Sequence, residues 1–185
     1  IHLKVYFYFL NYIINTNMKA IVSIIMGSTS DWPVMKKAAD FFESMEIPFE
    51  VNALSAHRTP EEVEKFAKNS VENGIKVIIA GAGMAAHLPG VIAAMTPVPV
   101  IGVPIKASLD GLDSLLAIVQ MPPGIPVATV AINGALNAGI LAAQMLATND
   151  REIFSKTVGY KKELKNKIVK ANQDLEKEKF KFRVS

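Results

Sequence analysis

Between Met18 and Leu146, apolar runs of strand length alternate with segments in which apolar residues recur at helical spacing, as in Val34, Ala38 and Phe41. The runs at 20–26, 49–54, 76–80, 98–103 and 127–132 predict strands, and helices are expected at about 34–45, 60–74, between 80 and 98, and at 135–146. Strands joined by crossover helices are parallel, and those helices cover both faces of the sheet. The alternation therefore predicts an α/β fold of three layers, α/β/α, around a parallel sheet of about five strands.

The two ends of the chain stand apart from this alternation. We interpret residues 1–17 as a leader that is non-native or disordered; the alternative is a signal peptide, but no small-residue cleavage site follows. Residues 18–149 then form one α/β domain, within the usual size of roughly 100–200 residues. Residues 150–185 predict a long C-terminal helix over about 151–182. Its apolar stripe needs a surface, so we expect this tail to pack on the domain or on a neighbouring subunit.

The composition excludes several classes of protein. The 185 residues include no Cys, which rules out disulfides, thiol nucleophiles and zinc–thiolate sites and fits a reducing compartment, so we expect a cytoplasmic protein. Residues 150–185 hold 11 Lys and Arg against 6 Asp and Glu, intermixed as on a solvated helix, so we expect no nucleic-acid binding. Pro and Gly interrupt both long uncharged stretches, 77–105 and 114–149, which argues against a membrane span. The scarcity of charge favours a homo-oligomer instead.

Polar residues in the apolar part of the chain gather in three loops, 27–31, 55–58 and 81–90, each after a predicted strand. Because the carboxyl ends of parallel strands share one edge of the sheet, where such folds bind ligands, we expect the loops to converge. The first, Gly27-Ser28-Thr29-Ser30-Asp31, offers hydroxyls and a carboxylate at a helix N-terminus and suits a phosphate beside a sugar diol. The alternative is a plain helix cap, for which Ser and Asp are favoured.

The second loop places His57 beside Arg58. An imidazole exchanges a proton near neutral pH, and a guanidinium can bind a phosphate through two nitrogens. Each residue alone is more often structural, but their position opposite a serine-rich loop favours a functional site. The following Thr59-Pro60-Glu61-Glu62 predicts a capping box that starts the next helix.

The third loop opens with Gly81-Ala82-Gly83-Met84-Ala85-Ala86, which is similar to a dinucleotide-binding fingerprint. It follows the third strand instead of the first, and no Asp or Glu between Glu72 and Asp110 could hold a ribose, so we expect no nicotinamide cofactor. The small residues would instead let backbone amides approach a carboxylate or carbon dioxide. His87 would close this loop or simply start a helix. The third loop has no carboxylate to complete a metal site, so we predict no metal.

Five segments in this order resemble the 5-(carboxyamino)imidazole ribonucleotide mutase family. They are Gly-Ser-Thr-Ser-Asp at 27–31, Ser-Ala-His-Arg-Thr-Pro at 55–60, Gly-Ala-Gly-Met-Ala-Ala-His-Leu-Pro-Gly at 81–90, Asp-Ser-Leu at 113–115 and Ile-Val-Gln-Met-Pro at 118–122. The resemblance covers nearly all of 18–147. It implies a flavodoxin-like sheet, an octamer, no cofactor, and an isomerase that moves a carboxyl group from the exocyclic nitrogen of the nucleotide to a ring carbon in purine (IMP) biosynthesis. An Arg at position 58, directly after His57, is similar to the pattern of the mutase branch of the family. Direct carboxylation of aminoimidazole ribonucleotide and a non-catalytic nucleotide-binding module remain alternatives.

The resemblance also implies roles for individual residues. His57 would be the general acid and base, and Arg58 would clamp the substrate phosphate. The substrate-binding set would be Ser28, Ser30, Asp31, Ser55, Ala56, Arg58, Ala82, Gly83, His87 and Leu88. Met84 stands where the family pattern leads us to expect Gly, and the stretches 106–111 and 133–138 look slightly shorter than usual, which bears on how the pocket closes.

Overall fold

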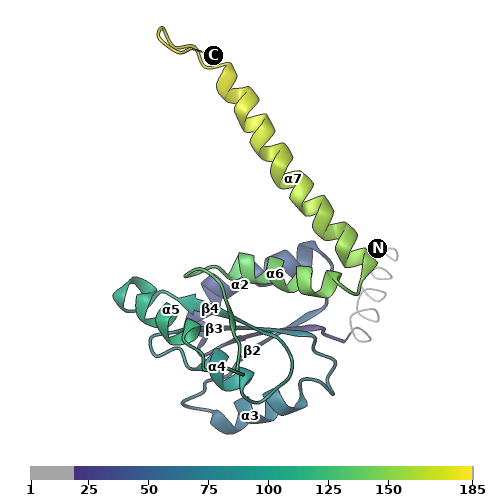
Figure 1. The fold of residues 1–185 in the computed structure, drawn as a ribbon, viewed down its shortest axis with the longest axis vertical. Coiled ribbons are helices and arrows are strands. Elements are labelled where there is room, and N and C mark those ends of the chain that lie inside the picture. Colours follow the sequence, from purple (N-terminus) through teal and green to yellow (C-terminus); the bar gives the residue numbers. More distant parts are fainter. Residues whose placement is uncertain (1–18, 185) are drawn as a thin grey trace, which may run out of the picture.

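The computed structural model describes residues 19–184, so the leader predicted at 1–17 lies outside the described residues. Five parallel strands form one sheet in the order β2-β1-β3-β4-β5 (Figure 1). Their bounds are β1 Val22–Met26, β2 Phe49–Ala53, β3 Val77–Gly83, β4 Val100–Ile105 and β5 Ala128–Thr129. The predicted α/β fold is therefore confirmed. From β1 the chain turns to one side to form β2 and to the other to form β3, so the order reverses beside β1, which is where such sheets have a ligand-binding crevice.

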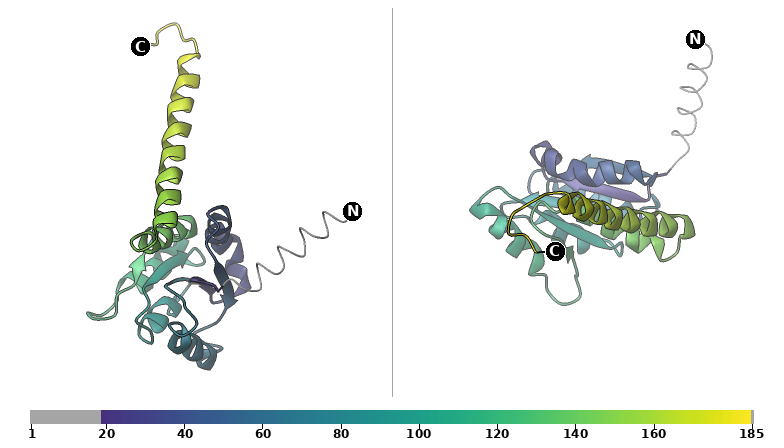
Figure 2. Two further views of the ribbon diagram at one scale, coloured as in Figure 1. Left: turned by 90° about the vertical axis from the view of Figure 1, so that its right-hand side faces the viewer. Right: turned by 90° about the horizontal axis from the view of Figure 1, so that it is seen from above.

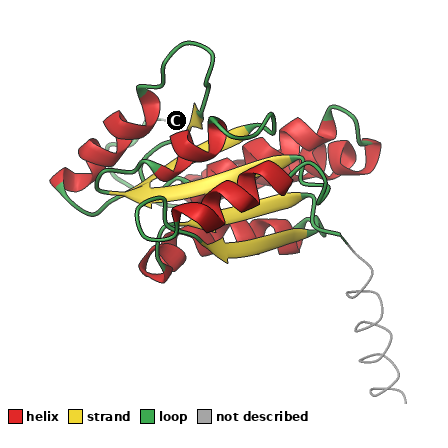
Figure 3. Ribbon diagram, turned by 90° about the horizontal axis from the view of Figure 1, so that it is seen from below, coloured by secondary structure: helices red, strands yellow, loops and turns green. Residues whose placement is uncertain are grey.

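Within residues 19–184, six α-helices and two short 3-10 helices accompany the strands. They are η1 Thr29–Asp31, α2 Trp32–Ser44, α3 Pro60–Asn69, α4 Leu88–Ala93, η2 Leu109–Gly111, α5 Leu112–Val119, α6 Ala135–Ala147 and α7 Arg151–Glu176. Helices α2 and α6 lie on one face of the sheet, and α3 and α4 lie on the other (Figures 1 and 3). The three layers predicted from the sequence are thus present.

Alternate residues of each central strand enter two separate cores. On β1, Ile24 packs with α2 and α6, whereas the next residue, Ile25, packs with α3 and α4. Both isoleucines are fully buried. Burial of the strands on both faces explains why they read as unbroken apolar runs instead of alternating patterns. The same burial makes the sheet a rigid base for the polar loops at its edge.

Several local predictions differ from the structure. Helix α5 was not expected, and β5 has two residues where six were predicted. Strand β3 continues through Gly83, so the third polar loop begins three residues later than predicted. The capping box at Thr59 is wrong. The Thr59 hydroxyl makes no cap to α3; it accepts a hydrogen bond from the Ser55 N–H at 2.9 Å and donates to the Ser55 carbonyl at 3.2 Å.

Helix α7 begins on the domain and then projects away from it (Figures 1 and 2). Asp150 caps its first turn by accepting hydrogen bonds from two backbone N–H groups. Ile153 is buried in the α2/α6 core, and the Tyr160 ring contacts the Phe41 ring edge-on at 5.2 Å between centroids. Every described residue from 161 onward is exposed. The predicted packing on the domain therefore holds for the first three turns only, and the helix ends at Glu176 instead of 182.

Gly102→Ala tests the close packing of β4 against Ile118 and Val127. A Cβ at residue 102 would lie 2.4 Å from Ile118 Cγ2 and 2.8 Å from Val127 Cγ1. Overpacking of this kind costs about 1–3 kcal/mol, so we expect the free energy of unfolding, measured with urea, to fall by that amount. The control is Gly159→Ala on α7, where a Cβ meets nothing within 4 Å and alanine favours the helix by about 1 kcal/mol. Equal stability of Gly102→Ala and the wild type would contradict the packing.

Candidate active site at the carboxyl edge of the sheet

The three polar loops meet around Gly27, the residue that follows β1. Its N–H donates to the Gly81 carbonyl of β3 at 3.4 Å, and its own carbonyl accepts a hydrogen bond from Arg58 Nη2 at 2.8 Å. The Leu54 N–H, just after β2, donates to the Met26 carbonyl at 2.9 Å. The structure thus brings together the segments at 27–31, 55–58 and 81–90 that the sequence placed at one edge.

The second loop is held as a tight turn between Ser55 and Thr59. Besides the two hydrogen bonds to the Thr59 hydroxyl, the Thr59 N–H donates to the Ser55 carbonyl at 2.9 Å. The Ser55 hydroxyl in turn accepts hydrogen bonds from both the backbone N–H and the Nε of Arg58, each at 3.3 Å. The guanidinium is therefore fixed by Ser55 on one side and by Gly27 on the other, and it remains exposed to a ligand.

The first loop turns sharply in η1 before α2 starts. Ser28 has an extended backbone, and its hydroxyl accepts a hydrogen bond from the Ser30 N–H at 3.3 Å. Asp31 stands at the start of α2, but its carboxylate makes no capping hydrogen bond to that helix. Burial raises the pKa of the Asp31 carboxyl, although hydrogen bonds from Ser28 and Ser30 and the charge of Arg58 act in the opposite direction. The alternative of a plain helix cap thus applies to Ser28 at η1 and not to Asp31.

His57 and His87 form a direct contact that joins the second loop to the third. His57 Nε2 lies 2.7 Å from His87 Nδ1, and the two rings meet edge to face with 4.9 Å between their centroids. At that distance one nitrogen carries the proton and the other accepts it. Both side chains are exposed. His87 precedes α4 without capping it through its side chain, so it does more than start a helix. The sequence predicted both residues at this edge but not the contact between them.

The remaining members of the predicted set form the walls below these polar groups. Ala82 and Leu88 are buried in the α3/α4 core, with Ala56 packed against it, so these three side chains shape the base of the site. Gly83 ends β3, and a Cβ there would lie 3.2 Å from the Ile105 carbonyl oxygen and 3.3 Å from Ala107 Cβ. The backbone of β3 therefore passes close to β4 where the third loop leaves the sheet.

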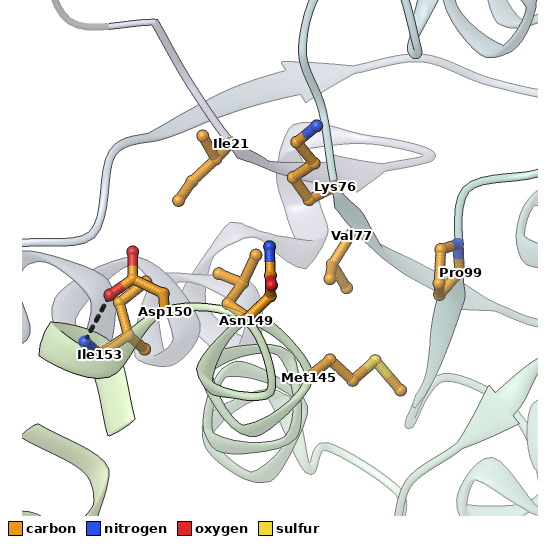
Figure 4. Close-up of a pocket in the computed structure, with 9 residues that line it drawn as sticks. Ile21, Lys76, Val77, Pro99, Met145, Asn149, Asp150 and Ile153 are labelled. Atoms are coloured by element: carbon orange, nitrogen blue, oxygen red, sulfur yellow. Dashed lines mark hydrogen bonds between the residues drawn. The ribbon is translucent and has the colours of Figure 1, made fainter. Parts of the chain in front are cut away.

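A groove of about 380 Å³ lies at the opposite, amino edge of the sheet (Figure 4). Ile21, Lys76 and Pro99, which line it, each precede a strand, and Met145, Leu146, Asn149, Asp150 and Ile153 come from the α6/α7 junction. The groove is mostly apolar and holds none of the predicted site residues.

Across the described range, no helix combines the length and the hydropathy of a transmembrane span.

Comparison with known proteins identifies the family. The AIR carboxylase family profile matches residues 21–167. The chain belongs to the AIR carboxylase family. It is 58% identical to N5-carboxyaminoimidazole ribonucleotide mutase of Thermotoga maritima over 84% of this chain and 91% of that protein, and 57% identical to the mutase of Pyrococcus horikoshii over 85% and 90%. Phosphoribosylaminoimidazole carboxylase of Candida glabrata is 62% identical over 75% of this chain, but the match spans only 24% of that longer protein.

Solved structures show the same fold. The crystal structure of Treponema denticola PurE aligns with a TM-score of 0.76 and 29% identity, covering 83% of this chain and 97% of that one. The predicted family and the flavodoxin-like fold are confirmed. The relatives that match along nearly their whole length are mutases, which supports the predicted enzyme class, an isomerase of purine biosynthesis.

Asp31→Asn tests the electrostatics of the first loop. Because burial raises the pKa of this carboxyl above 3.8 in the folded protein, its contribution to stability is present below pH 3.8 and is lost as the pH rises through the raised pKa. We therefore expect the stability of Asp31→Asn relative to the wild type to increase between about pH 3 and about pH 7 in urea denaturation. Glu43→Gln, an exposed carboxylate on α2, controls for the change in net charge. A relative stability that falls over this range would contradict the effect of burial.

Proposed function

We propose that the edge site binds 5-(carboxyamino)imidazole ribonucleotide and moves its carboxyl group from the exocyclic nitrogen to the ring carbon. The product is 4-carboxy-5-aminoimidazole ribonucleotide. The observation that carries this proposal is the contact between His57 and His87, made from the same loop that holds the exposed Arg58 guanidinium against Gly27. The histidine pair provides a proton donor and acceptor, Arg58 provides a group suited to phosphate, and the full-length mutase relatives supply the reaction class.

The phosphate and ribose would lie against the first two loops. Arg58, already oriented by Ser55 and Gly27, would pair with the phosphate through its exposed face. Ser28 and Ser30 would donate hydroxyl hydrogen bonds, and the Asp31 carboxylate would accept from the ribose hydroxyls once it is ionised. The imidazole base would then extend toward Gly83 at the end of β3, from which the third loop leads to His87 and its contact with His57.

In the net reaction the carboxyl group moves from the nitrogen to the ring carbon, and one proton moves from that carbon to the nitrogen. The carbamate N–C bond breaks and leaves its electron pair on the nitrogen, which takes a proton from the histidine pair as carbon dioxide is released. The ring carbon then attacks carbon dioxide with its own electron pair, and the proton on that carbon returns to the pair. Substrate and product are isomers, so the cycle consumes no oxidant and no ATP. A positioned acid and base contributes about 10²–10⁴-fold to such a step.

A direct carboxylase is the second candidate, because carboxylases also match this chain at 62% identity over part of their length. The two reactions differ in their starting material. An assay with the carbamate nucleotide as sole reagent, followed by its absorbance change, gives product only with a mutase. Turnover only of aminoimidazole ribonucleotide with bicarbonate would support the carboxylase, and binding without either reaction would support a nucleotide-binding module.

His57→Asn and Arg58→Ala should separate chemistry from binding. His57→Asn removes the group that exchanges the proton, so we expect kcat to fall by at least about 10²-fold while product binding, measured by calorimetry, persists. Arg58→Ala removes the phosphate partner, so KM should rise more than kcat falls. Arg58→Lys keeps the charge and serves as the control. A kcat of His57→Asn within a few-fold of the wild type would remove His57 from the proton transfer.

The proposal includes a homo-oligomer, the octamer expected from the family, in a cytoplasmic location and without cofactor or nucleic acid. Two exposed apolar stripes support an assembly. One runs along α5 through Leu112, Leu116 and Val119, and the other along α7 through Leu164, Ile168 and Leu175. In addition, Asp113 Oδ1 is buried and has no hydrogen-bond partner within the described residues, and a buried oxygen of this kind needs a donor from elsewhere.

The assembly predicts a solution mass that is a multiple of the 20.1 kDa chain, close to eightfold. Sedimentation equilibrium measures this mass directly. Leu116→Glu would place a charge in the α5 stripe, and we expect it to lower the mass because an unpaired charge is costly to bury. Lys170→Glu, a charge change on the outer part of α7, is the comparison and should have the smaller effect. A wild-type chain that sediments as a monomer at micromolar concentration would contradict the assembly.

A further inference from the structure

Strained backbone gathers at the same edge of the sheet as the candidate site. Among residues 19–184, six non-glycine residues have positive φ, and five of them lie in the loops that leave β3, β4 and β5. The five are Met84, Ala86, Leu109, Asp110 and Asn133. For residues with a Cβ, this left-handed region is sparsely populated and costs folding free energy. Strain of this kind tends to collect where a protein holds a ligand.

Two members of this group, Ala86 and Met84, lie in the third loop of the candidate site, and of these only Met84 is exposed. It has φ +56° and follows Gly83, and the turn is closed by a hydrogen bond from the Ala86 N–H to the Gly83 carbonyl at 3.0 Å. Its side chain is 62% exposed, so burial within the chain returns little free energy. Glycine would adopt the same backbone without strain. Neither the backbone conformation nor the packing of the single chain therefore explains a methionine at this position.

The position of Met84 relates it to the reacting groups. The turn begins at Gly83, which stands beside Ile105 of β4, and leads within three residues to His87, whose ring contacts His57 at 2.7 Å. Met84 thus lies in the turn that connects the end of β3 to the histidine pair, and it is exposed. Methionine is apolar and flexible, and it fills irregular spaces better than a branched side chain does.

We propose that Met84 covers the carbon dioxide formed during the reaction and keeps it in the site until the ring carbon captures it. The inference rests on the proposed function. After the carbamate N–C bond breaks, carbon dioxide has two fates: the ring carbon attacks it, or it escapes and leaves the protonated amine nucleotide behind. An apolar side chain over the pocket excludes water and favours the first fate. It takes no part in the proton transfers, so Met84 is a positioning residue.

The experiment follows the carboxyl carbon through turnover. The substrate carries a ¹³C label in its carboxyl group, the buffer contains unlabelled bicarbonate, and mass spectrometry measures the label in the product and the amount of decarboxylated nucleotide, corrected for the reaction without enzyme. The variants are Met84→Leu, Met84→Ala and Met84→Gly. We expect the wild type and Met84→Leu to retain the label. Met84→Ala and Met84→Gly should lose it several-fold more often for each substrate molecule consumed.

Thermal unfolding of the same variants separates the effect of losing the Met84 side chain from the effect of relieving backbone strain. Met84→Gly relieves the left-handed strain, so we expect its Tm to rise by a few degrees, on the scale of about 2–4 °C for a chain of this size. Met84→Ala keeps the strain and should unfold near the wild-type temperature. Only a lost side chain is common to both variants, so loss of label in both assigns the effect to the side chain.

Three results would overturn the inference. They are equal label retention in all four proteins, failure of Met84→Ala to fold, and a change in oligomeric mass for Met84→Ala without loss of label, which would assign Met84 to a contact between copies. A wild type that forms no product from the carbamate nucleotide would instead refute the proposed function. If the wild type and all variants form product that retains the label, the proposed function stands and only the role of Met84 is removed.

Discussion

The parallel pairing of β1 with both β2 and β3 determines where the site can be. Met26, the last residue of β1, stands in register beside Ala53 on one side and Gly81 on the other. The chains leaving these three positions therefore emerge at the same height of the sheet. Strand β1 stops there while β3 continues for two more residues. Gly27, which follows β1, is hydrogen-bonded to both flanking segments.

The histidine contact spans the end of β1. Neighbouring strands are about 4.8 Å apart, so β2 and β3, with β1 between them, are separated by about 10 Å. His57 follows β2 and His87 follows β3, and their rings meet at 2.7 Å, so the side chains and the turns that carry them cross the end of β1.

Some of these features could be predicted from the sequence and others could not, for physical reasons. Apolar runs indicated the central strands, because burial on both faces leaves few polar positions in them, such as Ser23 in β1. Helix α5 escaped prediction because its residues, from Leu112 to Val119, are apolar on nearly every side, so no polar face marks its period. The Thr59 hydroxyl could serve the start of α3 or the backbone of Ser55, and a local pattern cannot decide between two acceptable partners. The His57–His87 contact joins residues 30 apart through the tertiary fold alone.

The proposed chemistry needs a site closed to solvent, and the single chain leaves the site open. Carbon dioxide held between two steps must be kept from solvent, yet His57, Arg58 and His87 are all exposed. The walls that do exist, Ala82 and Leu88, lie on the inner side of the site. Two features of the described chain remain uncovered: the strained Met84 turn, and the exposed α5 stripe with the buried oxygen of Asp113 that has no partner among the described residues. Exposed apolar surface and a buried oxygen without a donor are both costly in a monomer, and both costs fall if the same assembly that covers them also closes the site.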